Sequence, residues 1–138
     1  MKKHKSHYHC LYHLKYHLIL ATKHKKNCFT PDILARLEQI FKHLCDKWEI
    51  ELLKFEGHPD HLHLILELHP NIMPSKLINN LKTVSSRLIR KDYLEHLSQF
   101  YEKPTLWSRA YCLVSAEGAS TNIFKQYIAN QVNIELPT

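Results

Sequence analysis

Two histidines separated by one leucine, His61 and His63, have the clearest potential for chemistry in this sequence. Residues 61–68 alternate in character, so in a strand the leucines face one side while both histidines, with Ile65 and Glu67, face the other. The rise of a strand sets the two histidine backbones roughly 7 Å apart. Such a pair can bind a divalent metal ion or can simply lie on an exposed sheet. In a chain with 12 histidines, the spacing alone favours the second interpretation.

A tyrosine and an amide, Tyr127 and Gln131, are spaced one helical turn apart near the end of the sequence. On one face of a helix they would place a phenolic nucleophile beside an oxygen ligand for a hard metal ion. The same spacing arises from amphipathic packing, with Tyr127 half-buried beside Phe124 and Ile128. Taken by itself this spacing favours packing. A functional interpretation needs the Tyr127 and Gln131 pair together with the His61 and His63 pair.

Four strands are predicted to carry or support these residues. Residues 8–20 alternate, with tyrosine, cysteine and leucine on one side and mainly histidine and lysine on the other. Residues 50–55 and 61–68 are predicted to form a hairpin around the connection 57–60, where glycine and proline favour a tight turn. The last strand is predicted over 111–115.

Three helices are predicted between and after these strands. The first begins at Thr30-Pro31-Asp32, which supplies an N-cap, a proline in the first turn and an early acid. The second spans 75–91, and the third spans 121–132 and carries Tyr127. The buried stripe of the second helix is predicted to comprise Leu77, Ile78, Leu81, Val84 and Leu88. The order of elements predicts an α+β fold of the ferredoxin-like split βαβ type, with two helices on one face of an antiparallel sheet plus a C-terminal helix carrying the tyrosine.

Composition limits the class of protein. Lysine and arginine outnumber aspartate and glutamate by 19 to 13, so the chain is a soluble basic protein or a partner of a polyanion. The four cysteines are widely spaced and form no CxxC pair, as expected for reduced core thiols of a cytoplasmic protein. No stretch is long and apolar enough to span a membrane, and the N-terminus lacks the apolar run of a signal peptide. A single domain over residues 1–138 is predicted.

Six segments, in chain order, carry a resemblance to a known family: Lys15-Tyr16-His17-Leu18, Pro59-Asp60-His61-Leu62-His63-Leu64-Ile65, Leu81-Lys82, Ser86-Arg87, Leu106-Trp107, and Tyr127 with Gln131. Together they resemble the single-tyrosine transposases of the HUH superfamily, of the insertion sequence 200/605 type. This superfamily is named for two histidines that flank a bulky hydrophobic residue. The resemblance covers nearly the whole chain.

The resemblance implies a metal-dependent enzyme that breaks and rejoins single-stranded DNA at hairpin-marked element ends. Tyr127 would be the nucleophile and would form a 5′-phosphotyrosine intermediate, while His61, His63 and Gln131 would be the metal ligands. The implied ion is magnesium, with manganese able to substitute, although the ligand types alone would also accept zinc or nickel. The implied assembly is a homodimer. We assign DNA contact to five basic or imidazole side chains: Lys15, His17, Lys82, Arg87 and Arg90.

Three alternatives remain open from the sequence. The chain could be a domesticated relative that binds hairpin or single-stranded DNA without cutting it. It could also be a histidine-rich protein that binds transition metals through its N-terminal region. The histidines of that region are His4, His7, His9, His13 and His17. Replication initiators and plasmid relaxases share the histidine pair and the tyrosine, but generally carry a third histidine ligand and longer DNA-binding segments.

Overall fold

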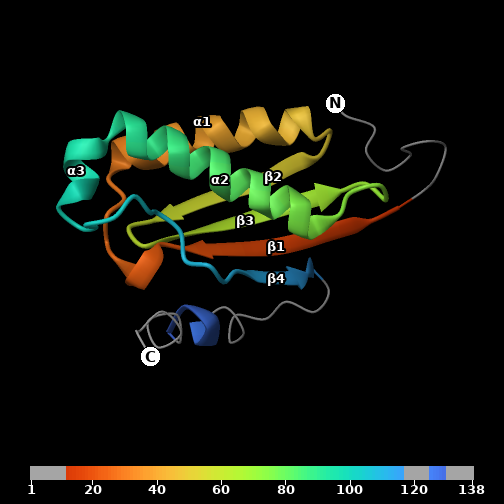
Figure 1. Cartoon of the computed structure of the whole chain (residues 1–138). Helices are drawn as coiled ribbons and strands as arrows, with labels where there is room; N and C mark the ends of the chain where they lie inside the picture. Colours follow the sequence, from red (N-terminus) through yellow and green to blue (C-terminus); the bar gives the residue numbers. More distant parts are fainter. Residues whose placement is uncertain (1–11, 117–124, 130–138) are drawn as a thin grey trace.

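The computed structural model describes residues 12–116 and 125–129. In chain order the elements are β1 (Leu14–Ala21), the short 3-10 helix η2 (Lys23–Lys25), α1 (Pro31–Lys47), β2 (Glu51–His58), β3 (His61–Leu68), α2 (Pro74–Asp92), α3 (Leu94–Ser98) and β4 (Cys112–Ser115). Residues 125–129 are helical. The strands form one antiparallel sheet in the order β2-β3-β1-β4, and α1 and α2 cover one face of it (Figure 1). The predicted α+β fold is confirmed. The part of the predicted tyrosine helix beyond 125–129 lies outside the described residues.

Helix α1 forms where the capping signals predicted it. The Thr30 hydroxyl accepts a hydrogen bond from the Ile33 amide at 3.2 Å, and Pro31 occupies the first helical position, where a proline costs no hydrogen bond. Ile33, Leu37 and other apolar side chains of its inner face are fully buried against the sheet. The first helix is therefore fixed by local sequence at its start and by burial along its length.

The hairpin of β2 and β3 is present, but its turn is shorter than predicted. Gly57 and His58 belong to β2 and pair with residues of β3, so only Pro59 and Asp60 form the connection. The glycine signals a close approach of α1 rather than a turn, because a Cβ atom at Gly57 would lie 2.7 Å from Cδ2 of Leu34. The tight two-residue connection also fixes the register that places His58 opposite His61.

Strand β1 has the two faces that the alternation predicted. Leu18 and Leu20 are fully buried in the core beneath the helices. His17 lies on the opposite face with Ile19 and Ala21, which are each only 1% exposed although they lie outside the main core cluster. The histidine-bearing face of the sheet is therefore partly covered rather than fully open. The predicted strand residues 8–11 lie outside the described residues.

The buried stripe of α2 differs from the prediction. Ser85 and Ile89 are fully buried, whereas Val84 and Leu88 are only half-buried. Ser85 is accommodated because its hydroxyl donates to the Leu81 carbonyl oxygen at 2.6 Å and accepts from Nε1 of Trp107 at 2.9 Å. Hydropathy could not reveal this position, since a serine whose hydrogen bonds are satisfied internally can occupy a core site. The short helix α3 was not predicted.

Two further sequence expectations can be compared with the structure. Cys28 and Cys45 are buried, as expected of core cysteines, whereas Cys112 is only half-buried, and Cys10 lies outside the described residues. No helix in the described part of the chain has the length and hydrophobicity needed to cross a membrane.

Candidate active site

The two histidines of the His61-Leu62-His63 motif alternate along β3 with leucines of the core, so they lie on the sheet face opposite α1 and α2. Leu62 and Leu64 point the other way and are fully buried in the core, as the alternation predicted. The side chains of His61 and His63 are 14% and 17% exposed, so both imidazoles are sheltered but accessible. The strand period thus places both rings on one face of the sheet.

The His61 imidazole is held by the residue that precedes it. Its Nδ1 lies 2.7 Å from Oδ1 of Asp60. Because an ionised carboxylate only accepts, Nδ1 must carry the proton, which leaves the lone pair of Nε2 available. The Asp60 carbonyl oxygen in turn accepts from the Thr22 amide at 2.9 Å and fixes the turn to the end of β1. The ring of His58 stacks on that of His61, with centroids 4.3 Å apart.

The His63 imidazole lies between a carboxylate and a second imidazole. Its Nδ1 is 3.5 Å from Oε1 of Glu56, and its Nε2 is 2.8 Å from Nδ1 of His17. If Nδ1 of His63 donates to Glu56, then Nε2 accepts a hydrogen bond from His17. In this arrangement the lone pair of Nε2 that a cation would need is engaged by His17, so cation binding requires that hydrogen bond to be released.

Burial keeps these imidazoles neutral. Desolvation is the largest cause that lowers the pKa of His61 and of His63 below the ordinary histidine value of 6.5. The neighbouring His17 lowers the pKa of His63 further, while Glu56 partly offsets that shift. For His61, the hydrogen bond to Asp60 raises the pKa and so opposes the effect of burial. A lowered pKa means that both rings are neutral at physiological pH, which is the form that binds metal ions.

The donor set fits a divalent ion, with a third ligand still required. Two neutral imidazoles whose Nδ1 atoms face carboxylates match the way metal-binding histidines are usually oriented. Among the residues that the structure describes, no group of three His, Cys, Asp or Glu side chains is arranged to hold a metal ion. Gln131, the predicted third ligand, lies outside the described residues. The roles of His61, His63 and Gln131 as ligands stay predictions.

Tyr127 lies in the helical segment 125–129 and is half-buried. Figure 1 shows this segment below β1 and β4, away from α1 and α2. The alternation of buried leucines along β3 puts His61 and His63 on the sheet face that those helices do not cover. Segments that are more than fifty residues apart in the sequence are thereby brought to the same side of the sheet. The arrangement is compatible with a nucleophile beside a metal site, and the role of Tyr127 stays a prediction.

The side chains assigned to DNA contact divide between two faces. Lys15 and His17 lie on β1, and His17 contacts His63. Lys82, Arg87 and Arg90 lie on α2, in the helical layer. The Lys82 ammonium donates to the carbonyl oxygens of Ser108 and Arg109 at 2.7 and 3.0 Å, so it holds the segment before β4 in place. Contact of these five residues with DNA is untested.

Sequence reasoning missed the groups that orient the histidines. Asp60, Glu56 and the contact between His17 and His63 received no role from the sequence. A signal for Glu56 was present, because a two-residue turn that pairs His58 with His61 also pairs Glu56 with His63. No local pattern indicates the contact of His17 with His63, because the two residues are 46 positions apart.

The chain is similar to several known proteins. Residues 10–131 match the family described as Transposase IS200 like. The chain is 28% identical over 124 residues to the transposase for insertion sequence element IS200 of Salmonella typhimurium, covering 90% of this chain and 80% of that protein. It is 26% identical over 121 residues to the ISDra2 transposase TnpA of Deinococcus radiodurans, covering 88% and 86%. The crystal structure of a protein assigned as a transposase in Deinococcus radiodurans R1 superposes with a TM-score of 0.80 at 30% identity, covering 88% of this chain and 92% of that one.

Proposed function

The chain belongs to the family of IS200-like transposases, and on this premise we propose that it cleaves and rejoins single-stranded DNA through a covalent bond to Tyr127. The observation that carries the proposal is the pair of neutral imidazoles, His61 and His63, on the side of the sheet where the Tyr127 segment also lies. Membership of a transposase family supports DNA cleavage. The assignment of the nucleophile, the ligands and the intermediate is our proposal.

In the proposed reaction the phenolic oxygen of Tyr127 forms a bond to the phosphorus of a DNA phosphodiester, and the bond between that phosphorus and the 3′ oxygen breaks. The phenol loses its proton and the leaving oxygen gains one, which gives a 5′-phosphotyrosine and a free 3′-hydroxyl. A phosphodiester replaces a phosphodiester, so the reverse reaction can rejoin strands without ATP. A free tyrosine has a pKa of about 10, so this hydroxyl requires activation at neutral pH.

We propose that His61, His63 and the side-chain oxygen of Gln131 hold a magnesium ion, for which manganese can substitute. When bound, this ion would offset the negative charge that develops on the phosphate and would help to activate the tyrosine hydroxyl. Asp60 orients His61 from its Nδ1 side, at 2.7 Å, and Glu56 lies on the corresponding side of His63. These carboxylates also make the imidazoles better electron donors, which suits cation binding.

The proposed substrate is single-stranded DNA that carries hairpins near the element ends. Unpaired strands allow in-line attack on a phosphodiester without interference from base stacking. Lys15 and His17 share the sheet face with the histidine pair and would hold the reacting strand, whereas Lys82, Arg87 and Arg90 would contact DNA from the helical layer. We further propose that the chain acts in the cytoplasm as a single-domain subunit of a homodimer.

A test is to incubate the protein with labelled single-stranded DNA from either side of its own gene, in magnesium or manganese, and to separate the products on a denaturing gel. A protein-linked DNA band is expected with the wild type and is expected to disappear with Tyr127→Phe, with His61→Ala and with chelator. Tyr93→Phe is the matched control, because its hydroxyl makes only a 3.4 Å bond to the Asp32 carbonyl oxygen in the helical layer.

The alternatives predict other results in the same assay. A DNA-binding protein that does not cut would shift the DNA under native conditions and give no adduct. A transition-metal-binding protein would give neither a shift nor an adduct. An adduct that persists in Tyr127→Phe would show that the nucleophile is another residue and would overturn the assignment of Tyr127.

A further inference from the structure

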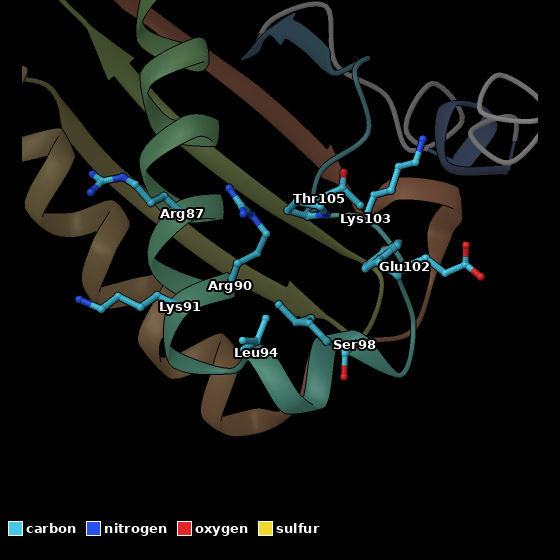
Figure 2. Close-up of a pocket in the computed structure, with 11 residues that line it drawn as sticks. Arg87, Arg90, Lys91, Leu94, Ser98, Glu102, Lys103 and Thr105 are labelled. Carbon is cyan, nitrogen blue, oxygen red and sulfur yellow. The ribbon is translucent and has the colours of Figure 1, made fainter.

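A cleft lies in the helical layer, away from the histidine pair, between the C-terminal half of α2, helix α3 and residues 101–105. Its volume is about 390 Å³. Figure 2 shows Arg90 extending from α2 into the space beside Thr105 and Lys103, while Arg87 and Lys91 point outward from the opposite rim. Arg90, Pro104 and Thr105 also line a second hollow. That second hollow is lined by polar residues that include Asn79, Thr83 and Ser86.

Charge makes the cleft suitable for an anion. Four cationic side chains line it against the single carboxylate of Glu102. The four are Arg87, Arg90, Lys91 and Lys103. Arg90 is held in position by a hydrogen bond from its Nε to the Ser86 hydroxyl at 3.0 Å, which leaves the two terminal nitrogens of the guanidinium directed elsewhere. A guanidinium fixed in this way suits a phosphate, because less side-chain freedom is lost on binding.

The floor and one wall of the cleft are apolar. Leu97 is buried beneath it, and Leu94, at the start of α3, is 67% exposed, which is the largest exposure of any large hydrophobic residue among those the structure describes. Tyr101 forms part of the wall, and its position is fixed because its hydroxyl donates to the Lys23 carbonyl oxygen at 2.7 Å. An exposed leucine inside a ring of cations favours a ligand that combines negative charge with a flat apolar group.

We propose that this cleft binds an unpaired nucleotide of single-stranded DNA, with the base against Leu94 and Tyr101 and the adjoining phosphates against Arg90 and Lys103. Unpaired bases pack on apolar and aromatic side chains while basic residues hold the backbone, and this combination is how proteins commonly bind single strands. The volume lies within the range of roughly 300–1,000 Å³ that is typical of pockets for small ligands, so it suits one nucleotide.

The position of the cleft gives it a separate task from the histidine pair. Helices α2 and α3 belong to the helical layer (Figure 1), whereas His61 and His63 lie on the sheet face opposite the core leucines of β3. A nucleotide in the cleft is therefore not the nucleotide that Tyr127 attacks. The cleft anchors a second segment of the DNA. This inference rests on the proposed function, because it assumes that single-stranded DNA is the substrate.

The test measures the binding of fluorescent oligothymidylate by anisotropy at several salt concentrations, with magnesium left out so that no cleavage occurs. Lys103→Ala and Arg90→Ala are each expected to reduce the slope of log affinity against log salt by about 1. Lys42→Ala is the matched control for charge, because Lys42 lies on α1, is 66% exposed and pairs with Glu38. It is expected to leave the slope unchanged.

The apolar part of the proposal has its own test. Leu94→Ala is expected to weaken binding of the oligothymidylate about tenfold, the magnitude of a lost base contact, and to have no effect on an oligonucleotide in which every base has been removed. Met73→Ala is the control, because Met73 is also an exposed hydrophobic residue but lies at the start of α2, outside the cleft. Thermal melting of each variant checks that it is folded.

Three results would overturn the proposal. One is an unchanged salt slope in both Lys103→Ala and Arg90→Ala. Another is an equal effect of Leu94→Ala on intact and base-free strands. The third is displacement of the DNA by polyglutamate as readily as by unlabelled oligothymidylate, which would indicate an acidic peptide as the ligand. Because anisotropy without magnesium needs no cleavage, a failure of the cleft to bind DNA and a failure of Tyr127 to form an adduct are measured separately and can be told apart.

Discussion

Two substitutions of Asp60, by asparagine and by alanine, are expected to weaken metal binding by His61 to different extents. The Asp60 carboxylate accepts from Nδ1 of His61 at 2.7 Å, and the two side chains are only 16% and 14% exposed. A hydrogen bond to a charged group contributes roughly 1.5–3 kcal/mol, against about 1 kcal/mol for a neutral one. Asp60→Asn keeps an acceptor and removes the charge, so it should cost about 1 kcal/mol, or about fivefold in affinity. Asp60→Ala removes both and should cost about 10–100-fold.

The assay is manganese titration by calorimetry or by electron paramagnetic resonance of free manganese, neither of which depends on cleavage. A second measurement, the nitrogen-15 spectrum of His61 in metal-free protein, reports which ring nitrogen carries the proton. The wild type should have the proton on Nδ1, and Asp60→Ala should show a mixture of both forms. Asp92→Asn is the control, because Asp92 is 41% exposed and makes only a 3.4 Å pair with Arg36.

The reasoning would be refuted if Asp60→Ala bound manganese as tightly as the wild type and kept the His61 proton on Nδ1. A loss of affinity with an unchanged proton position would also contradict it, because the residue would then act through folding of the turn. The Asp60 carbonyl oxygen, which accepts from the Thr22 amide, is retained in both variants, so the turn should persist.

Three further predictions concern pH and stability. Burial lowers the pKa of His61 and His63 in the folded protein. As the pH falls, these histidines therefore take up protons in the unfolded chain before they do so in the folded protein. The free energy of unfolding should be steady above about pH 6.5, the ordinary histidine pKa, and should decline below it. Urea titrations across this range, repeated with His63→Gln, should show a smaller decline in the variant. Ser85→Ala leaves the buried Nε1 of Trp107 without its 2.9 Å acceptor and should lower the free energy of unfolding by about 1–3 kcal/mol in urea titration; a neutral effect would contradict the role of that bond. Thr30→Ala removes the N-cap of α1 and should lower it by about 1 kcal/mol, whereas Thr30→Asp should retain most of the stability.

Much of the fold could be predicted because its signals are local. The capping residues before Ile33 and the alternation of residues 61–68 determined where α1 begins and where β3 lies, and both agree with the structure. The predictions were wrong where a residue type can occupy more than one kind of structural position. Gly57 indicated a turn but makes room for Leu34. Ser85 was not part of the predicted buried stripe but is buried with its hydrogen bonds satisfied.

The chemistry of the site divides in the same way. The period of a strand by itself determined that His61 and His63 share a face opposite the leucines, because alternation is a property of consecutive residues. Sequence motifs likewise predicted the family, which the match over residues 10–131 establishes.

Only the tertiary structure decided which groups surround the histidines. The register of β2 against β3 places Glu56 beside His63, and the pairing of β1 with β3 brings His17 to within 2.8 Å of the same ring. It also decided that the histidine face is partly covered and that a cationic cleft lies behind it in the helical layer. These features depend on contacts between residues far apart in the chain, and such contacts follow from packing of the whole sheet rather than from any local pattern.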